Sequence, residues 1–191
     1  YNRGYTPLKR RIEKKLRGLD VETRSFQDRL MVEPRQLDQE YDTFSPFYRE
    51  WKEIEKMSCF EEPENLVSIE SDQVPSKTVD TDIPAGGESA ALERWSAFRE
   101  NRLESYKDER DSVADPEAVS RLSPYYSSGM IGLRKVLGEV ESMIEDSDDS
   151  SDIRNYAKYR NELAWREFFY QVLYFNPGCV EQNYKQFENE I

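Results

Sequence analysis

The stretch NELAWREFFY, residues 161–170, lies inside a longer segment whose apolar side chains recur at helical spacing. The apolar positions of that segment, which runs from about Ile153 to Phe175, are Tyr156, Tyr159, Leu163, Phe169, Val172 and Leu173. This periodicity predicts one long helix. Glu162, Trp165 and Arg166 are spaced i, i+3 and i+4, so they lie on one face of that helix.

Two interpretations of that face are open. A purely structural helix rarely carries an acid, a large aromatic and an arginine together on its core side, so the face is a candidate functional site. The alternative is an ordinary amphipathic helix in which Glu162 and Arg166 form an ion pair, because such pairs are common and charged side chains are usually solvated. Spacing alone does not decide between them.

Composition limits the classes of protein that the chain can belong to. Its 191 residues suffice for one domain or for one domain and part of another, and 13% aromatic residues can supply a core. The absence of histidine excludes imidazole metal sites and Ser–His or Cys–His catalytic pairs, and we expect no metal. Cys59 and Cys179 have no metal or redox spacing, which fits a reducing cytoplasm. No apolar run approaches ~18–20 residues, so we expect no membrane span.

The net charge of −12 bears on both partner and source. Such a charge argues against non-specific attraction to phosphate. It also suits a protein from the very salty cytoplasm of a halophile, where screening removes much of that repulsion. The chain begins at Tyr1 without methionine and has no signal peptide, so we expect a piece of a longer polypeptide.

The N-terminal third predicts several short elements. Thr6-Pro7 predicts the start of a basic helix that stops near Gly18, and the alternation over residues 21–26 predicts a short strand. A helix followed by a strand is half of an α/β repeat. The basic face of this helix is interpreted as a solvated surface, with a nucleic-acid site as the alternative. Residues 44–51, FSPFYREW, predict a short helix capped by Ser45 that attaches by burying aromatic rings.

The middle of the chain predicts a linker and two helices. Residues 60–85 contain three prolines and little periodicity, which is typical of a linker. A helix is predicted from about Glu88 to Arg102, with its inward side at Ala91, Leu92, Trp95, Phe98 and Leu103. Residues 106–118 form a charged connection. A further helix is predicted after Gly129 to about Ile144, and the acidic loop 146–152 should cap the long helix without being an EF-hand.

Residues 120–125, SRLSPY, form a predicted loop between the charged connection and the next helix. Hydroxyls, backbone N–H groups and an arginine just before a helix can cradle an anion. The alternative is that the serines only cap the helix, which is the usual role of serine-rich loops in this position.

Five stretches, in order along nearly the whole chain, resemble the DNA photolyase/cryptochrome family. They are FSPFYREW at 44–51, GGESAAL at 86–92, Tyr106 with Arg110-Asp111, SRLSPY at 120–125 and NELAWREFF at 161–169. The resemblance implies a mostly α fold, the multihelical N-terminal half of an FAD-binding domain at 88–191. It implies an interdomain connector and linker at 31–87. Residues 1–30 would be the C-terminal remnant of an α/β antenna domain.

The resemblance also implies an FAD site. In the family the SRLS loop holds the FAD phosphates, so that role is implied for Ser120, Arg121, Leu122 and Ser123. Flavin contacts are implied for Tyr106, Tyr159 and Arg166. Tyr159 stands where many members carry tryptophan, and Val119 replaces a usual threonine, which removes one phosphate hydrogen bond.

A DNA site is implied as well. Glu162 and Trp165 match the two catalytic residues that receive a flipped pyrimidine dimer. An indole offers a stacking face, and a carboxylic acid can hydrogen-bond a pyrimidine carbonyl as charge develops on it. Arg110 matches a contact to the DNA backbone, and Arg166 and Phe169 complete the expected DNA-binding set.

The function that the resemblance implies is light-driven repair of cyclobutane pyrimidine dimers by electron transfer from excited reduced FAD, the reaction of a DNA photolyase, a lyase. One alternative is a cryptochrome-like photosensor without repair activity, and another is an acidic helical interaction module without a cofactor. Leu8-Lys9 replace the Asn-Glu of folate-binding relatives, so the antenna chromophore is left undefined. We expect damaged DNA as partner, a monomer, and no FAD or activity in the 191-residue chain alone.

Overall fold

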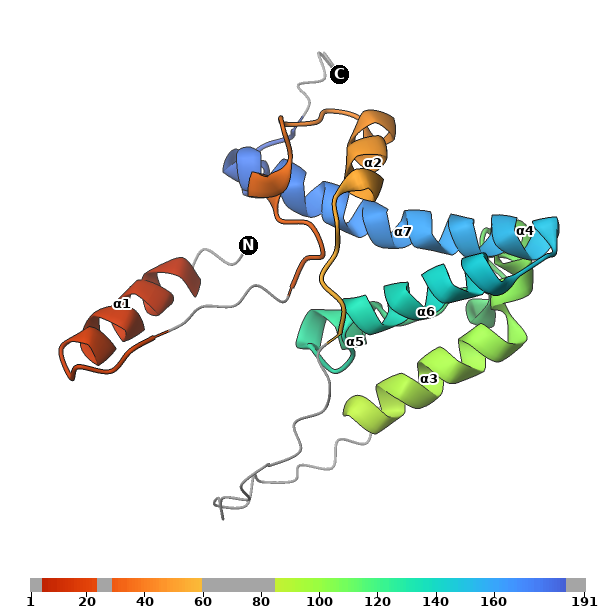
Figure 1. Cartoon of the computed structure of the whole chain (residues 1–191), viewed down its shortest axis with the longest axis horizontal. Helices are drawn as coiled ribbons and strands as arrows, with labels where there is room; N and C mark the ends of the chain where they lie inside the picture. The colour runs from red at the N-terminus through yellow and green to blue at the C-terminus, as the bar shows by residue number, and fades with distance from the viewer. Residues whose placement is uncertain (1–4, 24–28, 60–84, 185–191) are drawn as a thin grey trace. The chain divides into compact units, whose positions relative to one another are not determined.

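The structure is a computed structural model that describes residues 5–23, 29–59 and 85–184, without the side chains of Tyr5 to Pro7 (Figure 1). The described residues form α-helices and short 3-10 helices joined by irregular segments, with no strand among them. This confirms the predicted mostly α fold. The chain divides into two compact units. Unit 1 comprises Tyr1–Met57 and Ala157–Ile191, and unit 2 is Ser58–Tyr156.

The first helix of unit 1 is α1, Tyr5–Arg17, which confirms the predicted basic helix. Its last turn carries three cations, which interact favourably with the negative end of the helix dipole. After Gly18 the chain turns through Asp20, whose φ of 57° is left-handed. Val21 to Thr23 are irregular, so the predicted strand is absent there, and residues 24–26 lie outside the described ranges. A strand needs a hydrogen-bonded neighbour, and the described residues provide none.

The other helices of unit 1 are η1, Pro34–Gln36, α2, Phe44–Glu53, the larger part of α7, Ser150–Phe175, and η4, Pro177–Val180. Helix α2 has Thr43 as its N-cap, so the predicted cap, Ser45, lies inside the first turn. Pro46 is tolerated there because the first N–H groups of a helix have no intrahelical acceptor. Phe47 and Trp51 are spaced i, i+4 and fully buried, which confirms attachment by aromatic burial.

Unit 2 contains α3, Glu88–Asn101, and α6, Leu133–Asp146, both close to their predicted bounds. Between them lie η2, Leu103–Ser105, α4, Tyr106–Glu109, η3, Pro116–Ala118, and α5, Ser123–Ser128. The predicted connection and loop therefore contain short helices that periodicity could not reveal, because each is little more than one turn long. The predicted linker at 60–84 lies outside the described residues.

The core of unit 2 is apolar and aromatic, and one buried amide fixes its last helix. The core side chains are Ala91, Trp95, Phe98, Leu103, Tyr106, Ala118, Leu122, Tyr125, Ile131, Leu133, Val136, Leu137, Val140 and Tyr156. The buried amide of Asn155 accepts the Lys107 N–H at 2.7 Å and donates to the Ser151 carbonyl at 3.0 Å. Helix α7 begins with the Ser151 N–H bonded to Asp149 at 2.6 Å, which confirms that the acidic loop caps it.

Candidate functional site

The SRLS loop lies in unit 2, between η3 and α5. Leu122 is completely buried and precedes the first residue of α5, whereas Ser123 and Arg121 are exposed and Ser120 is half-buried. Arg121 has a φ of 55°, a left-handed conformation that non-glycine residues rarely adopt. The loop therefore consists of one buried apolar anchor and three accessible polar residues. These donors are of the kind that binds a phosphate, and their role toward FAD stays a prediction.

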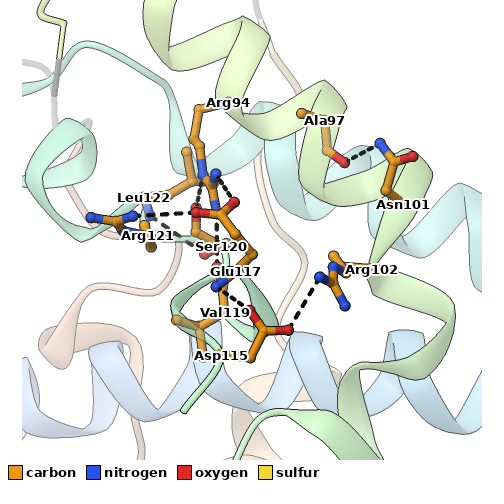
Figure 2. Close-up of polar contacts among 10 residues, drawn as sticks. All are labelled: Arg94, Ala97, Asn101, Arg102, Asp115, Glu117, Val119, Ser120, Arg121 and Leu122. Carbon is orange, nitrogen blue, oxygen red and sulfur yellow. Dashed lines mark hydrogen bonds and ion pairs between the residues drawn. The ribbon is translucent and has the colours of Figure 1, made fainter. Parts of the chain in front are cut away.

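Arg94 and Glu117, which the sequence analysis did not single out, make polar contacts with this loop (Figure 2). Arg94, on α3, donates from Nε to the Ser120 carbonyl at 2.8 Å and from Nη2 to the Val119 carbonyl at 3.1 Å. Its Nη1 bonds to the Glu117 carboxylate, which also accepts from Arg121 at 3.2 Å. The Arg94 guanidinium, and then Arg121, lower the pKa of the Glu117 carboxyl below the usual glutamate range.

Asp115, the N-cap of η3, stabilises the same segment. Its carboxylate accepts the Glu117 N–H at 2.9 Å and pairs with Arg102 at 3.1 Å. The segment before the loop is thus fixed by side-chain bonds on both sides of Glu117. The i, i+4 spacing of Glu117 and Arg121 was visible in the sequence, but it is a signal of helical pairing and these residues are not in one helix.

Tyr106 and Arg110 are neighbours on either end of the short helix α4. Tyr106 is buried, with its ring edge-to-face with Phe98 at a centroid distance of 5.7 Å. The Arg110 guanidinium lies 6.0 Å from the Tyr106 ring centroid and pairs with the exposed Asp111 at 3.2 Å. The Tyr-x-x-x-Arg spacing thus brings the two side chains into cation–π range. Their predicted roles toward flavin and DNA backbone are untested.

The Glu162 face of α7 lies in unit 1, and its charged residues have other partners than expected. Glu162 pairs with Lys158 at 2.9 Å, with both side chains part-exposed. Arg166 donates to the Arg29 carbonyl at 3.2 Å, and its guanidinium lies 4.7 Å from the Tyr170 ring centroid. Glu162 thus pairs with Lys158, one turn before it in the helix. Such part-exposed i, i+4 pairs are weak, about 0.3–0.5 kcal/mol.

Trp165 belongs to a series of stacked aromatic rings. One ring face lies against Phe44 with centroids 3.9 Å apart and planes 7° apart. Phe169, which is 62% exposed, stacks with Trp165 at 5.6 Å, and Tyr48 stacks on Phe44 at 5.3 Å. The part-exposed indole is thus held in a fixed orientation by α2. Tyr159, the predicted flavin contact on the same helix, is almost completely buried.

Glu167 and Gln171 were not among the candidate residues, and both are almost completely buried on α7. The Glu167 carboxylate accepts the N–H groups of Met31 at 2.5 Å and Val32 at 3.0 Å, and Trp51 Nε1–H at 2.8 Å. Burial raises the pKa of the Glu167 carboxyl, and these three N–H donors oppose that shift.

Gln171, one turn further along α7, makes two hydrogen bonds to the backbone of Tyr41. Its Oε1 accepts the Tyr41 N–H at 3.4 Å, and its Nε2 donates to the Tyr41 carbonyl at 2.8 Å. Leu163, Glu167 and Gln171 recur every four residues, which places both polar residues on the apolar side of the helix. That spacing is the signal that could have identified them.

Two general observations complete the site description. In the parts of the chain that the structure describes, no three acidic or cysteine side chains are grouped so that they could hold a metal ion. None of the helices within those same residues has the length and apolar character needed to cross a bilayer.

The described residues are thus multihelical, with a polar SRLS loop in unit 2 and a Glu–Trp–Arg face in unit 1. No family model matches the chain. It is 34% identical to the deoxyribodipyrimidine photo-lyase of Halobacterium salinarum over 164 residues, 79% of this chain and 34% of that protein. It is 33% identical to the Thermus thermophilus protein of the same name over 150 residues, 78% of this chain and 33% of the relative. The chain therefore spans about a third of the length of these relatives.

Solved structures agree with the sequence relatives. A bacterial class III photolyase from Agrobacterium tumefaciens has a TM-score of 0.80 and 25% identity, with 97% of this chain and 41% of that chain covered. A cryptochrome from Synechocystis has a TM-score of 0.72 and 24% identity over 96% of this chain and 43% of that chain, a likeness of fold alone. The chain belongs to the DNA photolyase/cryptochrome family.

Proposed function

We propose that the chain is part of a deoxyribodipyrimidine photolyase, which uses light and reduced FAD to repair cyclobutane pyrimidine dimers in DNA. The observation that carries the proposal is the α7 face. Glu162 and Trp165 remain part-exposed there, while the intervening Leu163 and Ala164 are buried. A protein that only packs this helix would have no need for an accessible indole beside an accessible carboxylate. The relatives that bear the photolyase name support the same choice.

The residues of the SRLS loop fit an FAD phosphate group. Ser120 and Ser123 supply hydroxyls, and the exposed Arg121 supplies a guanidinium, a donor set that suits a diphosphate. Leu122 would hold the loop through the burial of its side chain, while its N–H donates to the Ser120 hydroxyl at 3.5 Å. Tyr106 and Tyr159 are buried, so they offer little accessible surface for the flavin contact that the resemblance implies. FAD, when bound in its reduced form, supplies the excited electron that drives dimer splitting.

Trp165 would bind the flipped dimer. The indole is already oriented by Phe44, so little conformational entropy is lost when a second flat group contacts it. The exposed Phe169 extends the apolar surface beside it. Base–aromatic stacking contributes about 1–3 kcal/mol per base. Arg166 and Arg110 would add contacts to the DNA backbone, which supply affinity without sequence preference.

Glu162 would hydrogen-bond the pyrimidine carbonyl that gains negative charge. A donor that strengthens as charge develops acts on the reaction more than on binding. For this the carboxyl must be protonated or must share a proton with its neighbours. The part-exposed pair with Lys158 is weak enough to be exchanged for a ligand contact.

The 191-residue chain alone is proposed to lack stoichiometric FAD and activity. The chain spans about a third of the relatives' length. Ligand sites usually bury most of the ligand surface, which a third of a photolyase would not achieve. An absorption spectrum of the purified 191-residue chain, compared with that of the complete gene product, would measure this directly.

The test of the repair function uses Trp165→Ala and Glu162→Ala in the complete gene product. Trp165→Ala should weaken binding of dimer-containing DNA in the dark about tenfold or more, because one stacking contact is lost. Glu162→Ala should instead lower the repair per absorbed photon at saturating protein. Both variants should retain flavin, since the SRLS loop is unchanged. Lys158→Ala is the matched control, because it removes the same ion pair and keeps Glu162.

Two outcomes would overturn these assignments. Undiminished repair of bound dimer by Glu162→Ala would show that this carboxyl has no part in the reaction. Unchanged dimer affinity in Trp165→Ala would show that the lesion does not bind on α7, and would favour the photosensor alternative.

A further inference from the structure

Arg94 binds the SRLS loop through the loop's backbone. Its guanidinium uses Nε for the Ser120 carbonyl and Nη2 for the Val119 carbonyl, at 2.8 and 3.1 Å. The third nitrogen, Nη1, bonds to Glu117. Figure 2 shows all three nitrogens turned toward the segment from Glu117 to Ser120. One side chain of α3 therefore contacts the backbone on the N-terminal side of the residues predicted to hold phosphate.

The residue that follows these two carbonyls is in a strained conformation. Arg121 has a φ of 55°. A non-glycine residue in this region costs on the order of 1–2 kcal/mol and persists only where its surroundings determine it. On one side the burial of Leu122 fixes the chain, and on the other side Arg94 fixes the carbonyls of Val119 and Ser120. The strained turn is thus held from both ends.

We propose that Arg94 is a positioning residue for the phosphate-binding loop, with Glu117 as its counter-ion. The proposal rests on the proposed function, in which Ser120, Arg121 and Ser123 hold the FAD phosphates. Arg94 itself does not contact the cofactor. It sets the backbone path that leaves the Arg121 side chain exposed and keeps the half-buried Ser120 hydroxyl within reach of the Leu122 N–H, 3.5 Å away, before any ligand is present.

Arginine is the side chain that can do this. Its planar guanidinium presents donors in a rigid fork, so two carbonyls and one carboxylate are bound at once. The ammonium of lysine is a single point on a flexible stem and cannot keep all three contacts in one geometry. Arg94→Lys therefore keeps the charge beside Glu117 and loses the control of backbone geometry.

The two ion pairs of Glu117 differ in how easily a ligand can break them. Its bond to Arg121 joins two half-exposed side chains at 3.2 Å, a pair that an incoming phosphate can displace. Its bond to Arg94 is accompanied by two carbonyl bonds from the same guanidinium, so that contact remains when Arg121 leaves. Glu117 thus holds the Arg121 guanidinium beside η3 until an anion replaces the carboxylate.

The first experiment needs no cofactor. Amide hydrogen exchange over residues 119–126 is compared between wild type and Arg94→Lys in the complete gene product. Arg99→Lys is the matched control, because Arg99 lies on the same helix and pairs with Glu139 at 2.6 Å without contacting the loop. Exchange in this segment should be at least fivefold faster in Arg94→Lys and unchanged in Arg99→Lys. Equal exchange in wild type and Arg94→Lys would overturn the proposal.

The second experiment measures FAD affinity in a double-mutant cycle. Arg94→Lys should weaken FAD binding about tenfold, and Arg121→Ala should weaken it as well. If Arg94 acts through the loop, the effect of Arg94→Lys should shrink to less than threefold in the Arg121→Ala background. Additive effects, or an FAD affinity of Arg94→Lys equal to that of wild type, would overturn the positioning role.

The two proposals fail in different ways. A wild-type protein that binds no FAD, or whose affinity is indifferent to Arg121→Ala, would overturn the FAD site itself. Wild-type FAD binding that depends on Arg121 but not on Arg94 would leave the proposed function intact and remove Arg94 from it. Equal loss of melting temperature and FAD affinity in Arg94→Lys and Arg99→Lys would assign Arg94 a general structural role.

Discussion

Two glutamates organise the two units in opposite ways. Glu167 in unit 1 is 1% exposed, and its donors are uncharged groups that lie 116 to 136 residues away in the sequence. Glu117 in unit 2 is part-exposed, and its partners are the guanidinium groups of Arg94 and Arg121. Both carboxylates connect a helix to an irregular segment, but the Glu167 carboxylate is shielded from solvent and the Glu117 carboxylate is accessible to it.

This difference in burial determines whether each carboxylate contributes mainly to stability or mainly to local geometry. A buried carboxylate with buried donors is essential to the stability of its unit, because no water can take its place when it is removed. An exposed carboxylate between arginines adds little stability, since water and salt compete for every partner. Glu117 therefore affects the geometry of a loop, whereas Glu167 affects whether its unit folds.

The largest expected effect is that of Glu167→Ala. It leaves three buried N–H donors without an acceptor, each worth about 1–3 kcal/mol, so we expect a loss on the order of 4 kcal/mol in the free energy of unfolding. Glu167→Gln, which keeps one acceptor oxygen, should lose about half of that. Denaturant unfolding of the complete gene product measures both. A loss below about 1 kcal/mol for Glu167→Ala would contradict the comparison.

The second effect is a difference in pH dependence. The pKa of Glu117 is lowered, so its contribution is present above the ordinary value of 4.5 and is lost as pH falls through the folded-state pKa. The pKa of Glu167 is raised, so the folded state holds this proton more tightly, and that contribution is lost as pH rises above 4.5 through the folded-state pKa.

The measurement compares wild type with Glu117→Gln and with Glu167→Gln from pH 3 to pH 8. The difference in unfolding free energy between wild type and Glu117→Gln should shrink toward acid. The difference between wild type and Glu167→Gln should change with pH in the opposite sense. If these two differences in unfolding free energy changed with pH in the same direction, the contrast between the buried Glu167 and the part-exposed Glu117 would be wrong.

The smallest effect concerns salt. At about 1 M KCl the Debye length is about 3 Å, so the stability cost of Glu117→Gln, less than about 1 kcal/mol, should vanish. The cost of Glu167→Ala should persist, because its donors are buried and uncharged. The wild-type protein itself should become more stable, since screening reduces the self-repulsion of a net charge of −12. Equal wild-type stability in low and high KCl would remove the argument for a halophilic source.

The sequence predicted the long helices well and the contacts that fix the loops poorly. Periodicity identified α3, α6 and α7, because each has several turns and an apolar side. It missed α5, which is only six residues long, and it predicted a strand where Val21 to Thr23 have no partner. A local sequence pattern does not show whether a second strand lies beside the first to form hydrogen bonds with it.

The same limit applies to the candidate sites. The family resemblance proposed Ser120, Arg121 and Trp165 as site residues, and their roles stay predictions. Arg94 escaped notice because two of its partners are backbone carbonyls, which leave no trace in a sequence. Glu167 escaped notice because its donors lie at the other end of the chain, and a glutamate in a helix is ordinarily solvated.

The hydrogen bonds between α7 and the segment from Met31 to Tyr41 have a consequence for how the sequences of such chains can diverge. Glu167 and Gln171 recognise Met31, Val32 and Tyr41 through peptide groups that every residue except proline possesses. Homologues should therefore exchange the side chains of the segment from Met31 to Tyr41 freely, subject to apolar packing at 31 and 32. The helix side has no such latitude, because only glutamine reaches both the N–H and the carbonyl of residue 41. Substitution should be tolerated at Met31, Val32 and Tyr41 and selected against at Glu167 and Gln171, although both sets of residues take part in the same hydrogen bonds.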